Sequence, residues 1–134
     1  MNVSFDIKNL ALEQLHCAIE LFLEQRFIPA ITLAGAAEEV YGKAAARLNR
    51  RNAMRLVWDF VSLRNPTGKA EKQVADECNR VKNAIKHQTH GFIEFDPELE
   101  AFLLITRAIE NYLRLGKTKT DLMYQFSKST KNAG

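Results

Sequence analysis

The chain has 134 residues, a length that suits one compact domain and is too short for two. Hydrophobic residues make up 46% and charged residues 26% of it, which excludes the disordered and fibrous classes. The two cysteines, Cys17 and Cys78, are too few for a disulfide scaffold, so we expect reduced core thiols in a cytoplasmic protein. The longest uncharged run, Phe27–Ala37, has 11 residues against the roughly 20 that cross a bilayer, and residues 1–8 lack the pattern of a signal peptide. We therefore expect neither a membrane span nor export.

The formal net charge of +3 is unevenly distributed along the chain. Residues 43–86 hold eleven Lys or Arg against four acids, whereas residues 92–110 hold five acids and one Arg. A basic segment attracts polyanions, because clustered cations release counterions from a phosphate backbone. Solvated helix faces have the same pattern, so the charge raises the expectation of nucleic-acid binding only slightly.

The first half of the chain predicts two helices. The first begins at the cap residue Asp6 and ends near Gln25, and the second has Pro29 in its first turn and ends near Leu48. Gly35 in the second helix costs about 1 kcal/mol relative to Ala. We expect the small side chains around it to allow another helix to approach closely.

The second half predicts three or four more helices. A helix over residues 52–63 ends at the Asn-Pro-Thr-Gly break, and another covers residues 69–87. Asp96, Pro97 and Glu98 start a helix that ends at Arg114, before Gly116, and a short helix covers residues 121–126. The prediction is an all-α, single-domain helical bundle of five to six helices over residues 1–126, with a frayed tail at 127–134.

Familiar catalytic and metal-binding patterns are scarce. The six glycines never cluster as a nucleotide loop requires, and no paired-cysteine zinc pattern occurs, so we predict no cofactor and no metal. Glu13 and His16 form one Glu-x-x-His pair of the di-metal carboxylate type, although His16 is more simply a partly buried, hydrogen-bonded histidine. The helix neighbours Glu38 and Glu39 point about 100° apart, so we do not expect them to share a site.

The most informative stretch is residues 80–87. Val81 and Ile85 continue a buried stripe, whereas Arg80, Asn83 and His87 recur at three- and four-residue spacing on a second stripe nearly opposite to it. A guanidinium, an amide and an imidazole that titrates near neutral pH suit a phosphate group. The alternative interpretation is a solvated helix end, where the helix dipole favours cations.

Further basic side chains accompany this stretch. Lys82 and Lys86 lie on the same predicted helix, and Arg47, Arg50 and Arg51 span the junction of the second and third helices. These five residues are candidate contacts to a nucleic-acid backbone, with solvated surface as the alternative.

Residues 80–87 resemble the Arg-x(4–6)-His motif of the HEPN superfamily of small all-α domains. Lys82–His87 is similar to the Arg-Asn-x3-His form of that motif, with Lys in the Arg position. The resemblance implies a homodimer with the motif at a cleft between chains. Many members of the family are metal-independent ribonucleases, and in that case His87 would act on the RNA 2′-hydroxyl and Arg80 would neutralise the phosphorane, whereas other members are inactive binding or adaptor domains. The chain also resembles small bacterial helical proteins, through residues 31–39, 83–87 and 107–114.

Three function classes stay open at this point. The leading hypothesis is a HEPN-like domain that engages RNA or a nucleotide, with RNA cleavage undecided. The alternative is a catalytically silent, antitoxin-like adaptor that binds a protein partner, because Lys82 cannot grip phosphate through two parallel hydrogen bonds. A di-metal carboxylate bundle ranks third.

Overall fold

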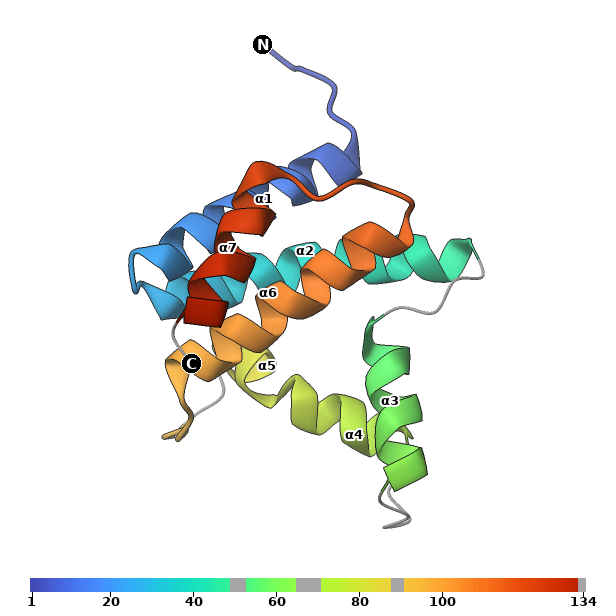
Figure 1. Ribbon diagram of the computed structural model, residues 1–134, viewed down its shortest axis with the longest axis vertical. Coiled ribbons are helices and arrows are strands. Elements are labelled where there is room, and N and C mark those ends of the chain that lie inside the picture. Colours follow the sequence, from blue (N-terminus) through green and yellow to red (C-terminus); the bar gives the residue numbers. More distant parts are fainter. Residues whose placement is uncertain (49–52, 65–70, 88–90, 133–134) are drawn as a thin grey trace.

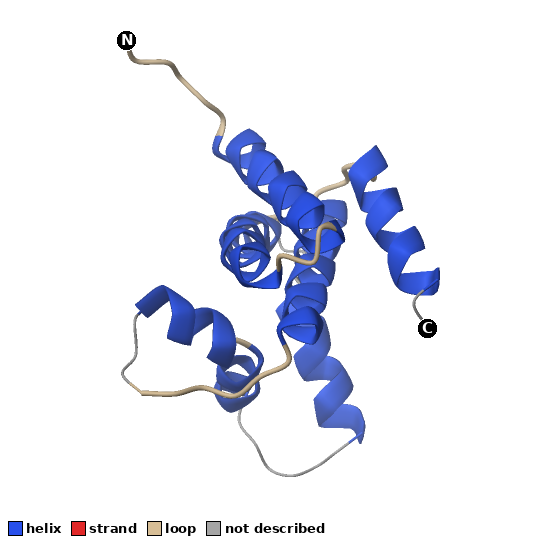
Figure 2. Ribbon diagram, turned by 90° about the vertical axis from the view of Figure 1, so that its left-hand side faces the viewer, coloured by secondary structure: helices blue, strands red, loops and turns tan. Residues whose placement is uncertain are grey.

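The computed structural model of the protein describes residues 1–48, 53–64, 71–87 and 91–132. Within these ranges the protein is all-α, with seven helices and no strand (Figures 1 and 2). The helices are α1 (Ile7–Leu23), α2 (Phe27–Arg47), α3 (Ala53–Arg64), α4 (Glu71–Cys78), α5 (Arg80–His87), α6 (Pro97–Arg114) and α7 (Asp121–Asn132). None of the described helices combines the length and apolar character that a bilayer crossing requires.

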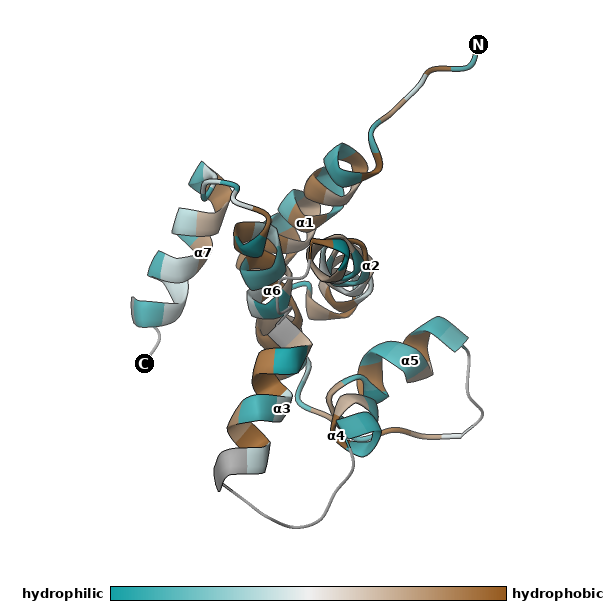
Figure 3. Cartoon of the chain, turned by 90° about the vertical axis from the view of Figure 1, so that its right-hand side faces the viewer, coloured by the Kyte–Doolittle hydropathy of each residue, from teal (hydrophilic) through white to brown (hydrophobic). Residues whose placement is uncertain are grey.

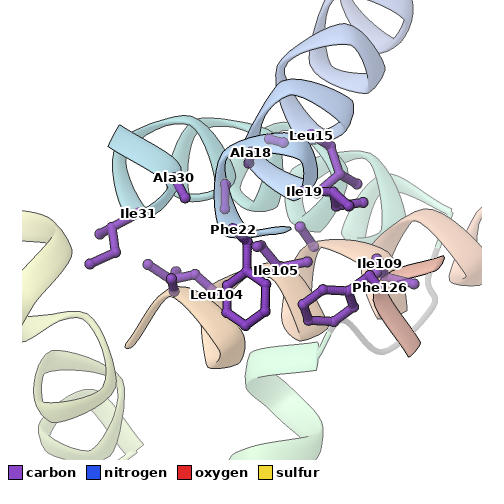
Figure 4. Close-up of a cluster of buried hydrophobic side chains, with 14 of the residues drawn as sticks. Leu15, Ala18, Ile19, Phe22, Ala30, Ile31, Leu104, Ile105, Ile109 and Phe126 are labelled. Carbon is purple, nitrogen blue, oxygen red and sulfur yellow. The ribbon is translucent and has the colours of Figure 1, made fainter. Parts of the chain in front are cut away.

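Three long helices, α1, α2 and α6, form the main body, and α7 lies against α1 (Figure 1). The central helix α2 packs along both α1 and α6. Its buried alanines allow both partners to come close, while larger side chains from the partners fill the core (Figure 4). The core includes Leu15, Ile19, Phe22, Ala30, Ile31, Leu104, Ile105 and Phe126. Each large apolar side chain buried there contributes about 1.5–3 kcal/mol.

A smaller group of helices, α3, α4 and α5, is attached to one side of the main body (Figure 3). α5 packs on α2, and α3 packs on α6 and α4. The single helix predicted over 69–87 is interrupted at Asn79, which accounts for the seventh helix beyond the five to six expected. The interruption coincides with contacts from α6: Arg107 donates to the Asn79 side-chain oxygen at 2.7 Å and to the Cys78 carbonyl at 3.4 Å.

The predicted helix starts at Asp6 and Asp96 are confirmed. The Asp6 carboxylate accepts from the backbone N–H of Lys8 at 2.8 Å, and that of Asp96 accepts from Leu99 at 3.1 Å, with Pro97 opening the helix. Each cap satisfies a backbone donor that the helix itself leaves without a partner.

The end of α7 and one cysteine differ from the sequence-based expectation. α7 continues to Asn132, past the expected end at Phe126, and the Ser127 hydroxyl donates to the Met123 carbonyl one turn earlier. Cys78 is half-buried, but Cys17 is exposed on the outer face of α1. The prediction of two core thiols is therefore wrong for Cys17.

The connection between α1 and α2 contains a non-glycine residue in the left-handed conformation. Gln25 has φ 63°, and the backbone N–H of Arg26 reaches the Leu21 carbonyl at 2.8 Å. This arrangement closes many helices, and glycine normally occupies the left-handed position because a Cβ is strained there.

We predict that Gln25→Gly raises the free energy of unfolding by about 0.5–1 kcal/mol, since it relieves this strain at an exposed site. Gln14→Gly is the matched control: Gln14 is exposed within α1, and there glycine costs about 1 kcal/mol. Urea unfolding measures both variants. A loss of stability in Gln25→Gly equal to that in Gln14→Gly would contradict the assignment of strain to Gln25.

Candidate functional site

The three candidate catalytic side chains lie on the exposed face of α5. Arg80, Asn83 and His87 are all exposed, whereas Val81 is 1% exposed and joins the core. The Arg80 guanidinium donates to the Glu94 carbonyl at 3.1 Å, which ties it to the segment that leads into α6. Arg80 and His87 are about 10 Å apart along the helix axis, with Asn83 between them.

The candidate nucleic-acid contacts are distributed differently from the prediction. Lys86 is exposed beside His87 on α5, and Arg47 is exposed in the last turn of α2. Arg50 and Arg51 lie outside the described residues. Lys82 is only 7% exposed, so it is not the surface cation that the sequence predicted.

Lys82 instead joins two carboxylates of α2. Its Nζ lies 3.0 Å from Glu39 Oε1 and 3.4 Å from Glu38 Oε2. The expectation that these two acids do not share a site is therefore wrong. The two carboxylates point in different directions from the helix, but one ammonium group between them reaches both.

Gly35 makes room for this lysine. A Cβ added at Gly35 would lie 2.6 Å from Lys82 Cδ and 2.9 Å from Lys82 Cγ, closer than real Cβ contacts. The close approach expected at Gly35 exists, but it is made by a side chain of α5 crossing α2 rather than by the backbone of another helix. The absence of a side chain at Gly35 thus leaves room for the buried ion pair, and the lower helix propensity of glycine is its cost.

A second cation reaches Glu38 from α6. Arg107 Nη2 lies 3.5 Å from Glu38 Oε2, and the Asn111 amide donates to the Glu38 backbone carbonyl at 3.2 Å. Glu38 is thus buried between Lys82 and Arg107 and joins α2, α5 and α6. Arg107 and Asn111 were not predicted as partners of Glu38, although a lone Arg within the apolar run of α6 indicates a buried ion pair.

Two hollows lie beside this charged cluster. A groove of about 350 Å³ between α2 and α5 is lined by Thr32, Gly35, Ala36, Glu39, Val40, Lys43, Lys82 and Lys86. A larger cleft of about 520 Å³ lies between α3, α4 and α6, and its lining is mainly apolar, with Leu56, Val57 and Leu103.

The one Glu-x-x-His pair, Glu13 and His16, joins no larger group of candidate metal ligands among the described residues. His16 is half-buried and its Nε2 lies 2.9 Å from the Thr120 hydroxyl, which confirms the prediction of a hydrogen-bonded histidine. Glu13 is exposed. The described part of the chain contains no group of three or more His, Cys, Asp or Glu side chains that could hold a metal ion.

Comparison with known proteins found no matching family model, no similar curated protein and no similar solved structure.

We predict that Gly35→Ala lowers the free energy of unfolding by about 1–3 kcal/mol, because the new methyl displaces the Lys82 side chain, which is held at both ends. Urea unfolding of Gly35→Ala, Lys82→Ala and the double variant forms a double-mutant cycle. In the Lys82→Ala background, Gly35→Ala should be neutral or stabilising by up to about 1 kcal/mol, as helix propensity alone predicts. An equal loss in both backgrounds would show that Lys82 is not the obstacle.

A second prediction concerns acid stability. Burial alone would raise the pKa of the Glu39 carboxyl, but the hydrogen bonds and charges of Lys82 and Lys86 outweigh it and hold the pKa below its ordinary value of 4.5. A carboxyl whose pKa is lowered by folding contributes stability above its unfolded pKa, and this contribution is lost as the pH falls through the folded value.

Glu39→Gln should therefore reduce stability at neutral pH, and the difference from the wild type should vanish as the pH falls below 4.5. Urea unfolding across this pH range measures the difference in stability. We expect this difference to be small, because the Glu39 side chain is 36% exposed and solvent screens its charge. Glu20→Gln, at an exposed site on α1, is the control. A wild-type advantage that grows with acidification would contradict the assignment.

Proposed function

We propose that this chain is a HEPN-like RNA-binding domain whose α5 face cleaves RNA without a metal ion. The observation that supports the proposal is the common exposed face of Arg80, Asn83 and His87, whose functional groups the core does not use. The proposal rests equally on the resemblance of residues 80–87 to the family motif.

The spacing on α5 suits one phosphate group. A phosphate over the middle of the helix lies about 5 Å along the axis from either end of the stripe, within reach of an arginine and a histidine side chain. The Asn83 amide, between them, supplies a further hydrogen-bond donor.

The chemistry divides between two side chains. The His87 imidazole takes the proton of the RNA 2′-hydroxyl while the hydroxyl oxygen bonds to phosphorus. The bond from phosphorus to the 5′-oxygen breaks, and the 5′-oxygen takes up a proton from water. The Arg80 guanidinium stabilises the charge that develops on the phosphorane, and its bond to the Glu94 carbonyl orients it beforehand. Neither role requires a metal ion.

A homodimer is part of the proposal. The α5 face is exposed in a single chain, whereas charge stabilisation works best where water is excluded. A second copy packed beside α5 would enclose the stripe, as the family resemblance implies.

A second candidate function is partner binding without catalysis. It is favoured by the cleft of about 520 Å³ between α3, α4 and α6, where Leu103 is exposed beside Leu56 and Val57. Apolar clefts of this kind accept the apolar face of a partner segment.

The test measures cleavage of labelled single-stranded RNA and transfer RNA in excess chelator. We expect His87→Ala and Arg80→Ala each to reduce the rate about 100-fold or more, with helicity and melting temperature unchanged. Lys117→Ala, at an exposed site in the link before α7, removes a comparable charge and should retain the wild-type rate.

Two outcomes would overturn the ribonuclease proposal. Equal cleavage by the wild type and His87→Ala would exclude the α5 face as the site. No cleavage by any of these proteins, with co-purification of a protein partner that Leu103→Asp releases, would favour the partner-binding alternative.

A further inference from the structure

The groove between α2 and α5 combines a cationic rim with an apolar floor. Lys43 from α2 and Lys86 from α5 are exposed at the groove, and the buried Lys82 forms part of its wall. Gly35, Ala36 and Val40 supply the apolar surface, and none of the described residues that line the groove is aromatic. The lining therefore suits an anionic group attached to a small carbon body, but offers no platform on which a nucleobase would stack.

The charges at the groove do not balance. Among the described residues that line the groove, three lysines face one carboxylate, Glu39, and the neighbouring Glu38 is buried between Lys82 and Arg107. Counted with the buried pair behind the wall, the cations Lys43, Lys82, Lys86 and Arg107 against Glu38 and Glu39 leave a net of about two positive charges. A phosphomonoester carries about −1.5 to −2 near neutral pH, so its charge matches this excess.

The lysines also retain hydrogen-bond donors for a ligand. An ammonium group has three N–H donors. Among the described residues, Lys82 uses two of them on Glu38 and Glu39, and Lys86 uses one on Glu39. The Glu39 carboxylate thus already lies between two of the three cations, Lys82 and Lys86. The third cation, Lys43, is exposed and can bind a second anion.

We propose that the α2–α5 groove is a binding site for a phosphomonoester. The phosphate would accept hydrogen bonds from Lys43 and Lys86, with Lys82 adding its charge from within the wall, and the carbon body would lie on Ala36 and Val40. The ligand is either a free small phosphate ester or the terminal phosphate of an RNA strand, and the second source rests on the proposed function.

The experiment titrates the full chain with propyl phosphate by calorimetry at fixed ionic strength, with butyrate as the carboxylate of similar size. We expect saturable binding of propyl phosphate and weaker binding of butyrate. Lys43→Gln and Lys86→Gln should each weaken the affinity for propyl phosphate about tenfold, as expected for loss of one charged hydrogen bond. Lys117→Gln, distant from the groove in sequence and likewise exposed, should retain the wild-type affinity.

Ala36→Leu tests the floor of the groove independently of charge. The larger side chain at this exposed lining position should abolish binding while the melting temperature is retained. No saturable binding of propyl phosphate to the wild type would overturn the site. Undiminished affinity in the double variant Lys43→Gln/Lys86→Gln would overturn it as well.

An RNA trinucleotide with and without a 5′-phosphate distinguishes the two sources. Lysine-dependent binding of the phosphorylated trinucleotide that is tighter than that of propyl phosphate identifies RNA as the ligand, and binding no tighter than that of propyl phosphate identifies a free phosphate ester. Phosphate binding without any RNA cleavage would overturn the ribonuclease proposal alone. RNA cleavage without phosphate binding would overturn the groove site alone.

Discussion

The ion pair of Lys82 with Glu38 and Glu39 is the contact on which the candidate site depends. α5 is an eight-residue helix, too short to be stable by itself, and α2 is the long helix to which it is attached. Val81 and Ile85 supply the apolar part of that contact, and Lys82 supplies the charged part. An ammonium group between two carboxylates fixes the rotation of α5, because a small turn of the helix would leave a buried charge without its partner.

That rotation decides what α5 presents to solvent. With Val81 and Lys82 directed inward, Arg80, Asn83 and His87 are left on the outer face. Arg107 secures the same arrangement from α6, since it contacts both Glu38 and the interruption at Asn79 where α5 begins. The exposed stripe and the buried charges are therefore two sides of one helix, and the geometry of the first depends on the second.

The parts of this structure that sequence predicted are those governed by local physics. The caps Asp6 and Asp96 and the extent of α6 follow from residues within one turn of each helix end. The burial of Lys82 could not be predicted in this way, because charge alone indicates exposure and the carboxylates that bury it come from α2, more than 40 residues earlier. The contact that accompanies the interruption at Asn79 likewise comes from a distant residue, Arg107, 28 residues further along the chain.

The two neighbouring acids of α2 differ in what they can do, although one lysine reaches both. Glu38 is buried between Lys82 and Arg107, so its removal would leave buried positive charge uncompensated. Glu39 is partly exposed at the groove, where it pairs with Lys82 and Lys86 and also contacts solvent. Well-packed apolar residues often stabilise a core as well as a buried ion pair does. Stability alone therefore does not account for a buried lysine in this wall, whereas fixing the rotation of α5 does, and the proposed anion site would use the same charge.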